Sequence, residues 1–187
     1  MTLWELAVAV FDAAESMEIP HMAVGAIAVG AHGIPRATRD IDLLVSVDSQ
    51  KGVFQLIKCL DSFIEFEPQA QFDTITWGRR HVGVARNPPP FKVELFEMFD
   101  DPFVISEFSR KMKAYVPMLS KDVWLQTAED LVVQKLRWGR SKDLDDARDV
   151  LAVQGPETLD MTYIQNWCSI HGTTERLETI LASLPPL

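Results

Sequence analysis

The chain has few cysteines and no long apolar run, and these absences exclude several classes of protein. Only Cys59 and Cys168 occur in 187 residues, too few and too far apart for a disulfide framework. No apolar run approaches the roughly 18 residues of a membrane-spanning helix. The N-terminus lacks the basic segment and cleavage site of a signal peptide. We therefore expect a cytoplasmic protein with no membrane contact, in which both thiols are reduced and buried.

Positive charge is also scarce. The chain has 18 lysines and arginines against 27 aspartates and glutamates, which gives a net charge of −9. Such a surface lacks the counterion-release term that drives binding to extended DNA, so we exclude that partner. A nucleotide is not excluded, because a bound divalent cation reverses the sign of the local field.

Common cofactor motifs are missing as well. The sequence holds neither a G-x-x-x-x-G-K-[ST] nor a G-x-G-x-x-G pattern, which removes the P-loop and Rossmann interpretations. The four histidines have no zinc-ligand spacing with one another. A short basic and aromatic hairpin is consistent with contact to an RNA end, although a solvated hairpin tip is the favoured interpretation; it consists of Trp77-Gly78-Arg79-Arg80-His81.

The first hundred residues alternate between helical and strand patterns. Thr2 and Glu5 match a capping box at the start of a helix over 2–18. Small residues after Gly25 predict a short second helix, and Asp48 or Ser49 is expected to cap a third. β-branched and alternating segments predict strands at 21–24, 40–47, 62–67, 71–77, 80–86 and 91–98, with Gly78 in a turn.

The character changes after residue 100. Asp101-Pro102 begins one predicted helix, and further helices are expected over 127–138, from Ser141 to Gly155, and over about 161–170 and 174–183. The fold class is therefore α+β: a mixed β-sheet core with helices on one side, then a helical C-terminal half. We expect residues 1–100 to form the core and 101–187 to pack on it as one compact protein.

Asp40 and Asp42 are the first candidates for chemistry. They lie two apart on a predicted strand, so their side chains leave the same face. Two adjacent carboxylates repel by about 1 kcal/mol in water and more when partly buried, and Mg²⁺ or Mn²⁺ would relieve this repulsion. The alternative is that both acids face solvent or pair with Arg36 and Arg39.

The segment before these aspartates is suited to phosphate. Gly25 and Ala26 lie where a short strand ends and a helix begins, and free N–H groups at a helix start bind phosphate oxygens. Arg36 and Thr38, just upstream of the acidic pair, add further groups for nucleotide binding. The alternative role for Gly25 is turn geometry alone.

Two blocks of this sequence resemble the DNA polymerase β-like nucleotidyltransferases, and within them the AbiEii-type and related minimal nucleotidyltransferases, many of which are toxin–antitoxin components. The first block runs from Val24-Gly25-Ala26 to Arg39-Asp40-Ile41-Asp42. The second runs from Glu129 through Lys135 to Asp146. The resemblance covers residues 1–155 and implies a nucleotidyltransferase-like sheet core.

The resemblance also implies residue roles. Asp40 and Asp42 would bind the metal, and the matching third position is Glu94, where the family more often has aspartate. Lys135 would contact the triphosphate. Asp143 would either bind the nucleotide beside Lys135 or orient the Lys135 side chain, and Asp146 would orient Lys135 as well. Alternatives stay open: Glu94 as an exposed strand residue, Lys135 as a surface lysine, and Asp143 as a charge favoured at a helix start.

The implied reaction transfers NMP from an NTP to an acceptor hydroxyl. A tRNA or other RNA end, a partner protein and a small molecule all remain open as acceptors. Ala26 in place of a second glycine or serine, together with Glu94, favours an alternative: a binding or regulatory, antitoxin-like protein with weak or lost catalysis. A D-x-D glycosyltransferase is a weaker third interpretation, because only about 40 residues precede the acidic pair, short of a nucleotide-binding domain.

Overall fold

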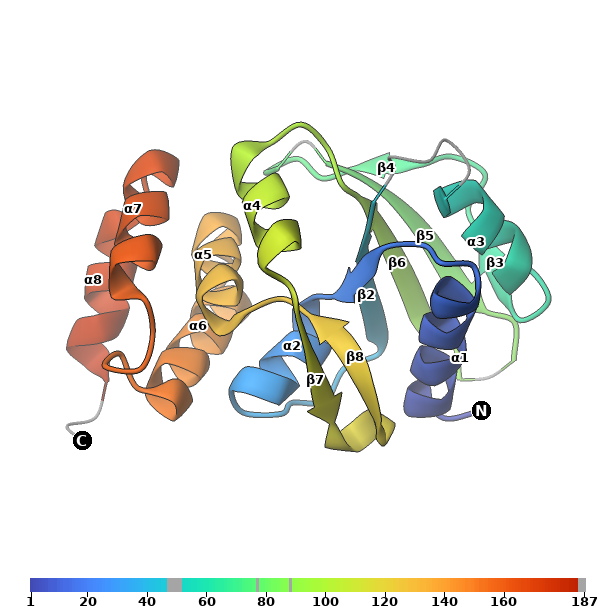
Figure 1. Cartoon of the computed structure of the whole chain (residues 1–187), viewed down its shortest axis with the longest axis horizontal. Helices are drawn as coiled ribbons and strands as arrows, with labels where there is room; N and C mark the ends of the chain where they lie inside the picture. The colour runs from blue at the N-terminus through green and yellow to red at the C-terminus, as the bar shows by residue number, and fades with distance from the viewer. Residues whose placement is uncertain (47–51, 77, 88, 185–187) are drawn as a thin grey trace.

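The computed structural model describes residues 1–46, 52–76, 78–87 and 89–184. The predicted helix cap, Asp48 or Ser49, lies outside these ranges, as does Trp77 of the predicted hairpin. The chain forms a central sheet with helices around it (Figure 1). Within the described residues, none of the helices has the length and apolar content needed to cross a bilayer.

The sheet is mixed, as predicted. In the described residues it contains eight strands in the order β3-β5-β6-β2-β1-β8-β7, with β4 paired to β5. β2 runs antiparallel to β1 but parallel to β6, and β1 runs parallel to β8. The strands are β1 (His21–Ala23), β2 (Asp40–Val45), β3 (Ile64–Phe66), β4 (Gln71–Phe72), β5 (Arg79–Ala85), β6 (Lys92–Glu97), β7 (Met112–Val116) and β8 (Lys121–Leu125).

Helices α1 (Leu3–Ser16) and α3 (Gly52–Leu60) form the predicted layer on one face of the sheet. The capping box of α1 is present: the Glu5 amide donates to Thr2 Oγ1 at 3.2 Å, and the Thr2 amide donates to Glu5 Oε2 at 2.7 Å. Their apolar sides pack with the inward side chains of β2, which include Ile41 and Leu43. Alternation along β2 therefore directs Asp40 and Asp42 to the other face.

On that other face lies α4 (Pro102–Arg110), a helix additional to the predicted layer. Asp101 caps it, as predicted, by accepting hydrogen bonds from the amides of Phe103 and Val104. Val104 belongs to an apolar cluster with Leu44 of β2. Helix α4 thus covers the apolar part of the sheet face on which the two aspartates lie.

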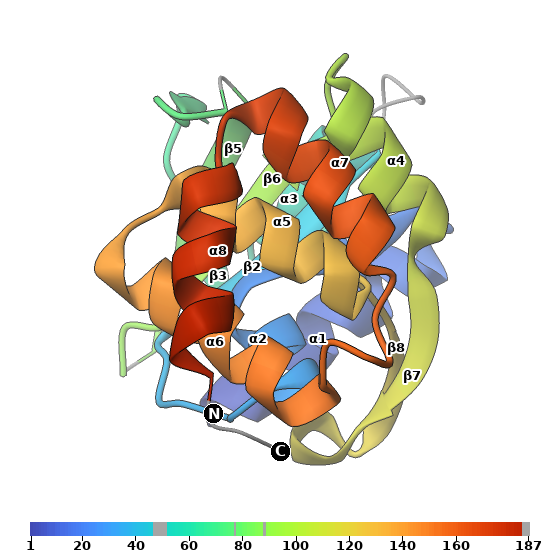
Figure 2. The ribbon, with the colours of Figure 1, turned by 90° about the vertical axis from the view of Figure 1, so that its left-hand side faces the viewer.

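The predicted helices of the C-terminal part are present: α5 (Ala128–Trp138), α6 (Ser141–Gln154), α7 (Met161–His171) and α8 (Thr174–Ser183). Thr127 caps α5 by accepting from the Asp130 amide at 3.2 Å. Figures 1 and 2 show α7 and α8 outermost, with α5 and α6 nearer the sheet. Helix α2 (Gly25–His32) joins them through Ala28 and Val29, which lie in the same apolar cluster.

The hairpin of β7 and β8, with the 3₁₀ turn Pro117–Leu119 between its strands, was not predicted. β7 is an edge strand whose side chains are largely exposed, Met112 by 43% and Tyr115 by 60%. Since β8 pairs with β1, the sheet crosses the predicted boundary at residue 100. The C-terminal part is therefore not purely helical.

Two smaller predictions are corrected. The strand expected over 71–77 shortens to β4, because Asp73 Oδ1 accepts from the amides of Ile75 and Thr76 and turns the chain. Both cysteines are free, but only Cys168 is buried. Cys59 is exposed because the apolar stripe of α3, which includes Leu56 and Leu60, faces the core on another side of that helix.

Candidate functional site

Three carboxylates from two neighbouring strands share one face of the sheet. In the parallel pairing of β2 with β6, Asp42 lies opposite Glu94, and Asp40 lies two residues earlier on β2. All three line a cavity of about 120 Å³ between the sheet, the start of α2, and α5 with the start of α6. The strand register therefore brings together the three acids that the sequence assigned to a metal.

The surroundings of Asp42 disfavour its negative charge. Burial, together with the negative charges of Glu94 and Asp40, raises the pKa of the Asp42 carboxyl to about 7, and Lys135 and Lys142 oppose this rise. Desolvation and like charges both disfavour the ionised form. A divalent cation would remove this penalty, because oxygen ligands from carboxylates suit Mg²⁺ and Mn²⁺.

Gly25 allows the start of α2 to approach Asp42 closely. Its φ is +60°, and a Cβ there would lie 2.0 Å from Asp42 Oδ2. Only glycine fits a position that combines left-handed backbone with this contact. Val24, the N-cap, makes no side-chain capping bond, and Ala26 lines the cavity. The first N–H groups of α2 thus face the same space as the aspartates, which suits a phosphate.

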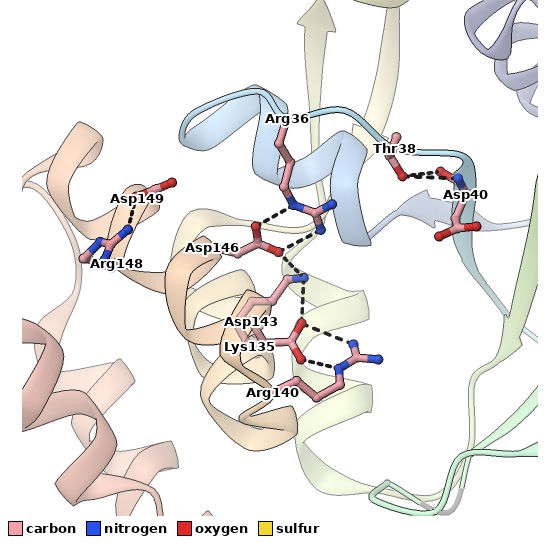
Figure 3. A network of polar contacts seen from close by, with 9 residues as sticks. All are labelled: Arg36, Thr38, Asp40, Lys135, Arg140, Asp143, Asp146, Arg148 and Asp149. Atoms are coloured by element: carbon pink, nitrogen blue, oxygen red, sulfur yellow. Dashed lines mark hydrogen bonds and ion pairs between the residues drawn. The ribbon is translucent and has the colours of Figure 1, made fainter.

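Lys135 is a buried lysine, 2% exposed, so its interpretation as a surface residue is wrong. Its Nζ donates to Asp143 Oδ1 at 3.2 Å and to Asp146 Oδ2 at 2.7 Å (Figure 3). Arg36 donates to both oxygens of Asp146, at 2.7 and 3.0 Å. Arg140 Nε donates to Asp143 Oδ2 at 2.5 Å. Two buried aspartates therefore hold three cations in fixed positions.

This network corrects the direct role predicted for Asp143. Lys135, Arg36 and Arg140 line the cavity, whereas Asp143 is fully buried behind its wall with both oxygens bound to cations. Burial raises the pKa of Asp146, but hydrogen bonds from Arg36 and Lys135 outweigh that effect and lower it. Asp143 and Asp146 thus position cations, as the sequence allowed, and are not placed to touch a nucleotide themselves.

Glu94 is not the exposed strand residue of the alternative interpretation, since it lines the cavity and pairs with Arg80. The distance from Arg80 Nη1 to Glu94 Oε2 is 3.1 Å, and Arg80 Nη2 also donates to Gln71. Within the described residues no three acids, histidines or cysteines already form a metal-binding group. Asp40 and Asp42 therefore offer two adjacent ligands, and Glu94 has to turn away from Arg80 to become the third.

Thr38 and Arg80 complete the wall. Thr38 Oγ1 accepts from the Asp40 amide at 3.2 Å and so fixes the chain just before the acidic pair. Arg80 had been grouped with a solvated hairpin tip, but its side chain points into the cavity. The strand register explains this position, because Arg80 pairs with Phe96 and is thus the diagonal neighbour of Glu94. Four further residues line the cavity and were not identified from the sequence: Asp73, Phe96, Trp138 and Lys142.

Comparison with known proteins identifies the fold. No protein-family model and no curated protein sequence matches the chain. An antigenic nucleotidyltransferase-like protein from Paracoccidioides brasiliensis superposes with a TM-score of 0.55 at 20% identity, over 99% of this chain and 94% of that one. ANT(2")-Ia, in complex with adenylyl-2"-tobramycin, superposes with a TM-score of 0.62 at 12% identity, over 91% of this chain and 99% of that one.

The chain therefore has the nucleotidyltransferase fold, an α+β arrangement around a mixed sheet. At these identities the likeness extends to the fold and no further. The finer resemblance to AbiEii-type proteins stays a prediction.

Proposed function

We propose that the protein is a metal-dependent nucleotidyltransferase that transfers NMP from an NTP to an acceptor hydroxyl. The observation that supports this most strongly is the cluster of Asp40, Asp42 and Glu94 opposite the start of α2, in a cavity otherwise rich in cations. A divalent cation among the three acids would relieve their mutual repulsion. The cations around them are placed for the phosphates of the nucleotide.

The acidic cluster fits Mg²⁺ or Mn²⁺ by its donor set and by the raised pKa of Asp42. Bound there, the metal would lower the pKa of the acceptor hydroxyl and neutralise charge on the leaving pyrophosphate. Asp40 and Asp42 would hold it, with Glu94 as the third ligand after release from Arg80. This assignment rests on the carboxylate chemistry and on the strand register.

The remaining side chains would bind the triphosphate. Free N–H groups at the start of α2 would donate hydrogen bonds to phosphate oxygens at the positive end of the helix dipole. Lys135, Arg36 and Arg140 are held rigid by buried aspartates, so their positive charge lies in place before substrate arrives. Preorganised charge of this kind stabilises a transition state without reorganisation during the reaction.

The acceptor is the least determined part of the proposal. ANT(2")-Ia is seen with an adenylylated antibiotic, so the fold admits a small hydroxyl-bearing molecule as acceptor. The net charge of −9 weighs against an RNA end such as that of tRNA. A small molecule or a partner protein is therefore favoured, and a toxin–antitoxin role has no independent support.

A transfer assay tests the reaction. Each α-labelled NTP is incubated with total tRNA, with lysate protein and with the small-molecule fraction of a lysate, in Mg²⁺ or in EDTA. We expect Asp42→Asn to lower product formation by about 100-fold or more, since a bound metal lowers the activation barrier by several kcal/mol. Asp145→Asn is the matched control, because that side chain is 61% exposed on α6 and lies outside the cavity. Undiminished transfer by Asp42→Asn would refute the metal assignment.

A second candidate function is nucleotide binding without transfer, and the pairing of Glu94 with Arg80 favours it. Isothermal titration separates the two functions. Mg²⁺-dependent NTP binding, unchanged in Glu94→Gln and accompanied by no transfer to any acceptor, would support the binding protein. Binding weakened in Glu94→Gln, together with transfer by the wild type, would support the enzyme.

A further inference from the structure

A second cavity adjoins the candidate site on the same face of the sheet. It has a volume of about 40 Å³ and lies over Leu44 and Phe96, each two residues beyond one of the acids Asp42 and Glu94 on its strand. Phe96 and Trp138 line both cavities. Helices α4 and α5 enclose it from the other side, through Val104 and Gln134 among others. The two cavities are therefore adjacent and share the side chains of Phe96 and Trp138 in their walls.

Three buried polar atoms, carried by residues that line this second cavity, have no hydrogen-bond partner within the described residues. They are Gln126 Oε1, Gln134 Oε1 and Trp138 Nε1, all buried. Gln126 is 1% exposed, and its Nε2 donates to Glu107 Oε2 at 2.5 Å, which leaves the carbonyl oxygen as the free atom. Buried polar atoms in folded proteins almost always have partners. A polar ligand in this cavity would give these three atoms partners once their side chains turn toward it.

The cavity selects for an uncharged ligand. Its surface is mainly apolar, whereas the first cavity is lined by Arg36, Lys135 and Arg140. Of the acids in its wall, Glu97 pairs with His81 and Arg79. Burial raises the pKa of Glu107 well above its ordinary value, because the apolar surroundings disfavour its negative charge. A phosphate or a metal ion belongs in the first cavity, and a neutral group belongs in the second.

We propose that the second cavity receives the edge of the nucleotide base, with Gln126 and Gln134 accepting hydrogen bonds from base N–H groups and Trp138 Nε1 donating one. The volume holds only a few water molecules, so the base edge enters while the rest of the ring lies at the mouth. There the rings of Phe96 and Trp138 have centroids 6.4 Å apart. This inference rests on the proposed nucleotide site and adds the residues that read the base.

The pattern of free atoms also selects among the bases. Two acceptors and one donor on the protein complement a base edge with two N–H donors and one acceptor. The Watson–Crick edge of guanine has that pattern, whereas uracil has two acceptors and one donor. An unmatched pattern leaves buried polar atoms unpaired, and sites of this type discriminate strongly against such ligands. GTP should therefore bind at least about tenfold more tightly than UTP, with each lost hydrogen bond accounting for roughly such a factor.

The test measures the Kd values of GTP, ATP, CTP, UTP and inorganic tripolyphosphate by isothermal titration in Mg²⁺. Gln134→Leu removes one acceptor, and Trp138→Phe removes the donor while keeping a ring. Each should weaken GTP binding about tenfold and leave tripolyphosphate binding unchanged. Gln134→Leu should not lower Tm, because the unpaired amide is removed from the interior. Gln165→Leu, an exposed change on α7, is the matched control.

The outcomes separate this inference from the proposed function. Tripolyphosphate and all four NTPs binding equally to wild type would overturn the base site and leave the phosphate site intact. Unchanged GTP affinity in both variants, with transfer to an acceptor reduced, would assign the cavity to the acceptor instead and overturn the inference. Absence of Mg²⁺-dependent binding for every one of these ligands would refute the nucleotide site itself.

Discussion

The close approach of α2 to the acidic pair makes Gly25→Ala an informative perturbation. The φ of +60° at Gly25 imposes a strain of about 1–2 kcal/mol on alanine. The added Cβ would also lie 2.0 Å from Asp42 Oδ2, whereas close carbon–oxygen contacts are about 3.3 Å. Asp42 or the start of α2 must therefore move by about 1 Å, and a displacement of that size lowers activity roughly 100-fold.

Gly172→Ala provides the matched control. Gly172 has a φ of +67° and nothing within 4 Å of its added Cβ, so alanine there meets backbone strain alone. At about 2–4 °C per kcal/mol for a chain of this size, Tm should fall by about 2–8 °C in Gly172→Ala. The Tm of Gly25→Ala should fall by at least as much, and this variant should also lose Mg²⁺-dependent NTP binding. Calorimetry and titration of both variants would refute the reasoning if Gly25→Ala bound NTP like wild type.

Three further predictions concern other parts of the chain. The folded-state pKa of Glu107 is raised above its unfolded value near 4.5, so the free energy of unfolding should fall as pH rises above 4.5. Glu107→Gln should flatten this pH dependence in urea melts from pH 5 to 8. The same pH dependence in wild type and Glu107→Gln would contradict the prediction. Lys135→Met should destabilise the fold by about 1.5–3 kcal/mol, because Asp143 and Asp146 each lose one charged partner and keep Arg140 and Arg36. Exposed Lys142→Met should change stability by less than about 0.5 kcal/mol and only weaken NTP binding; equal losses would argue against the network. Native protein should show one fast thiol toward a disulfide reagent, Cys59, with buried Cys168 reacting only on unfolding; two fast thiols would show that α7 opens readily.

Local signals explain how much of the fold was predictable. Thr2, Asp101 and Thr127 cap helices through side-chain contacts within three residues, so each helix start is encoded where it occurs. The hairpin of β7 and β8 lacked such a signal. β7 is stabilised by pairing with β8, and β8 by pairing with the distant β1.

The site residues likewise divide into those that local sequence places and those that depend on distant contacts. Asp40 and Asp42 share a face because of the two-residue period of a strand, which is a property of the local sequence. The burial of Lys135 follows from Asp143 and Asp146 approaching it from the next helix, which spacing alone does not fix. The second cavity and its unpaired amides result from α4 and α5 meeting over the sheet. No sequence pattern encodes such a meeting.

The pairing of β1 with β8 has a consequence for how the chain folds. β1 is three residues long, lies in the interior of the sheet, and meets β8 through the pair Ala23 and Leu125. About a hundred residues must be traversed before this pairing can form, and such non-local contacts slow folding. During synthesis, therefore, residues 1–100 emerge without a neighbour for one side of β1. Because one side of β1 is unpaired in a fragment ending there, we expect this fragment to be prone to aggregation. It also lacks Lys135, so we expect it to be unable to bind a nucleotide until the remainder of the chain is supplied.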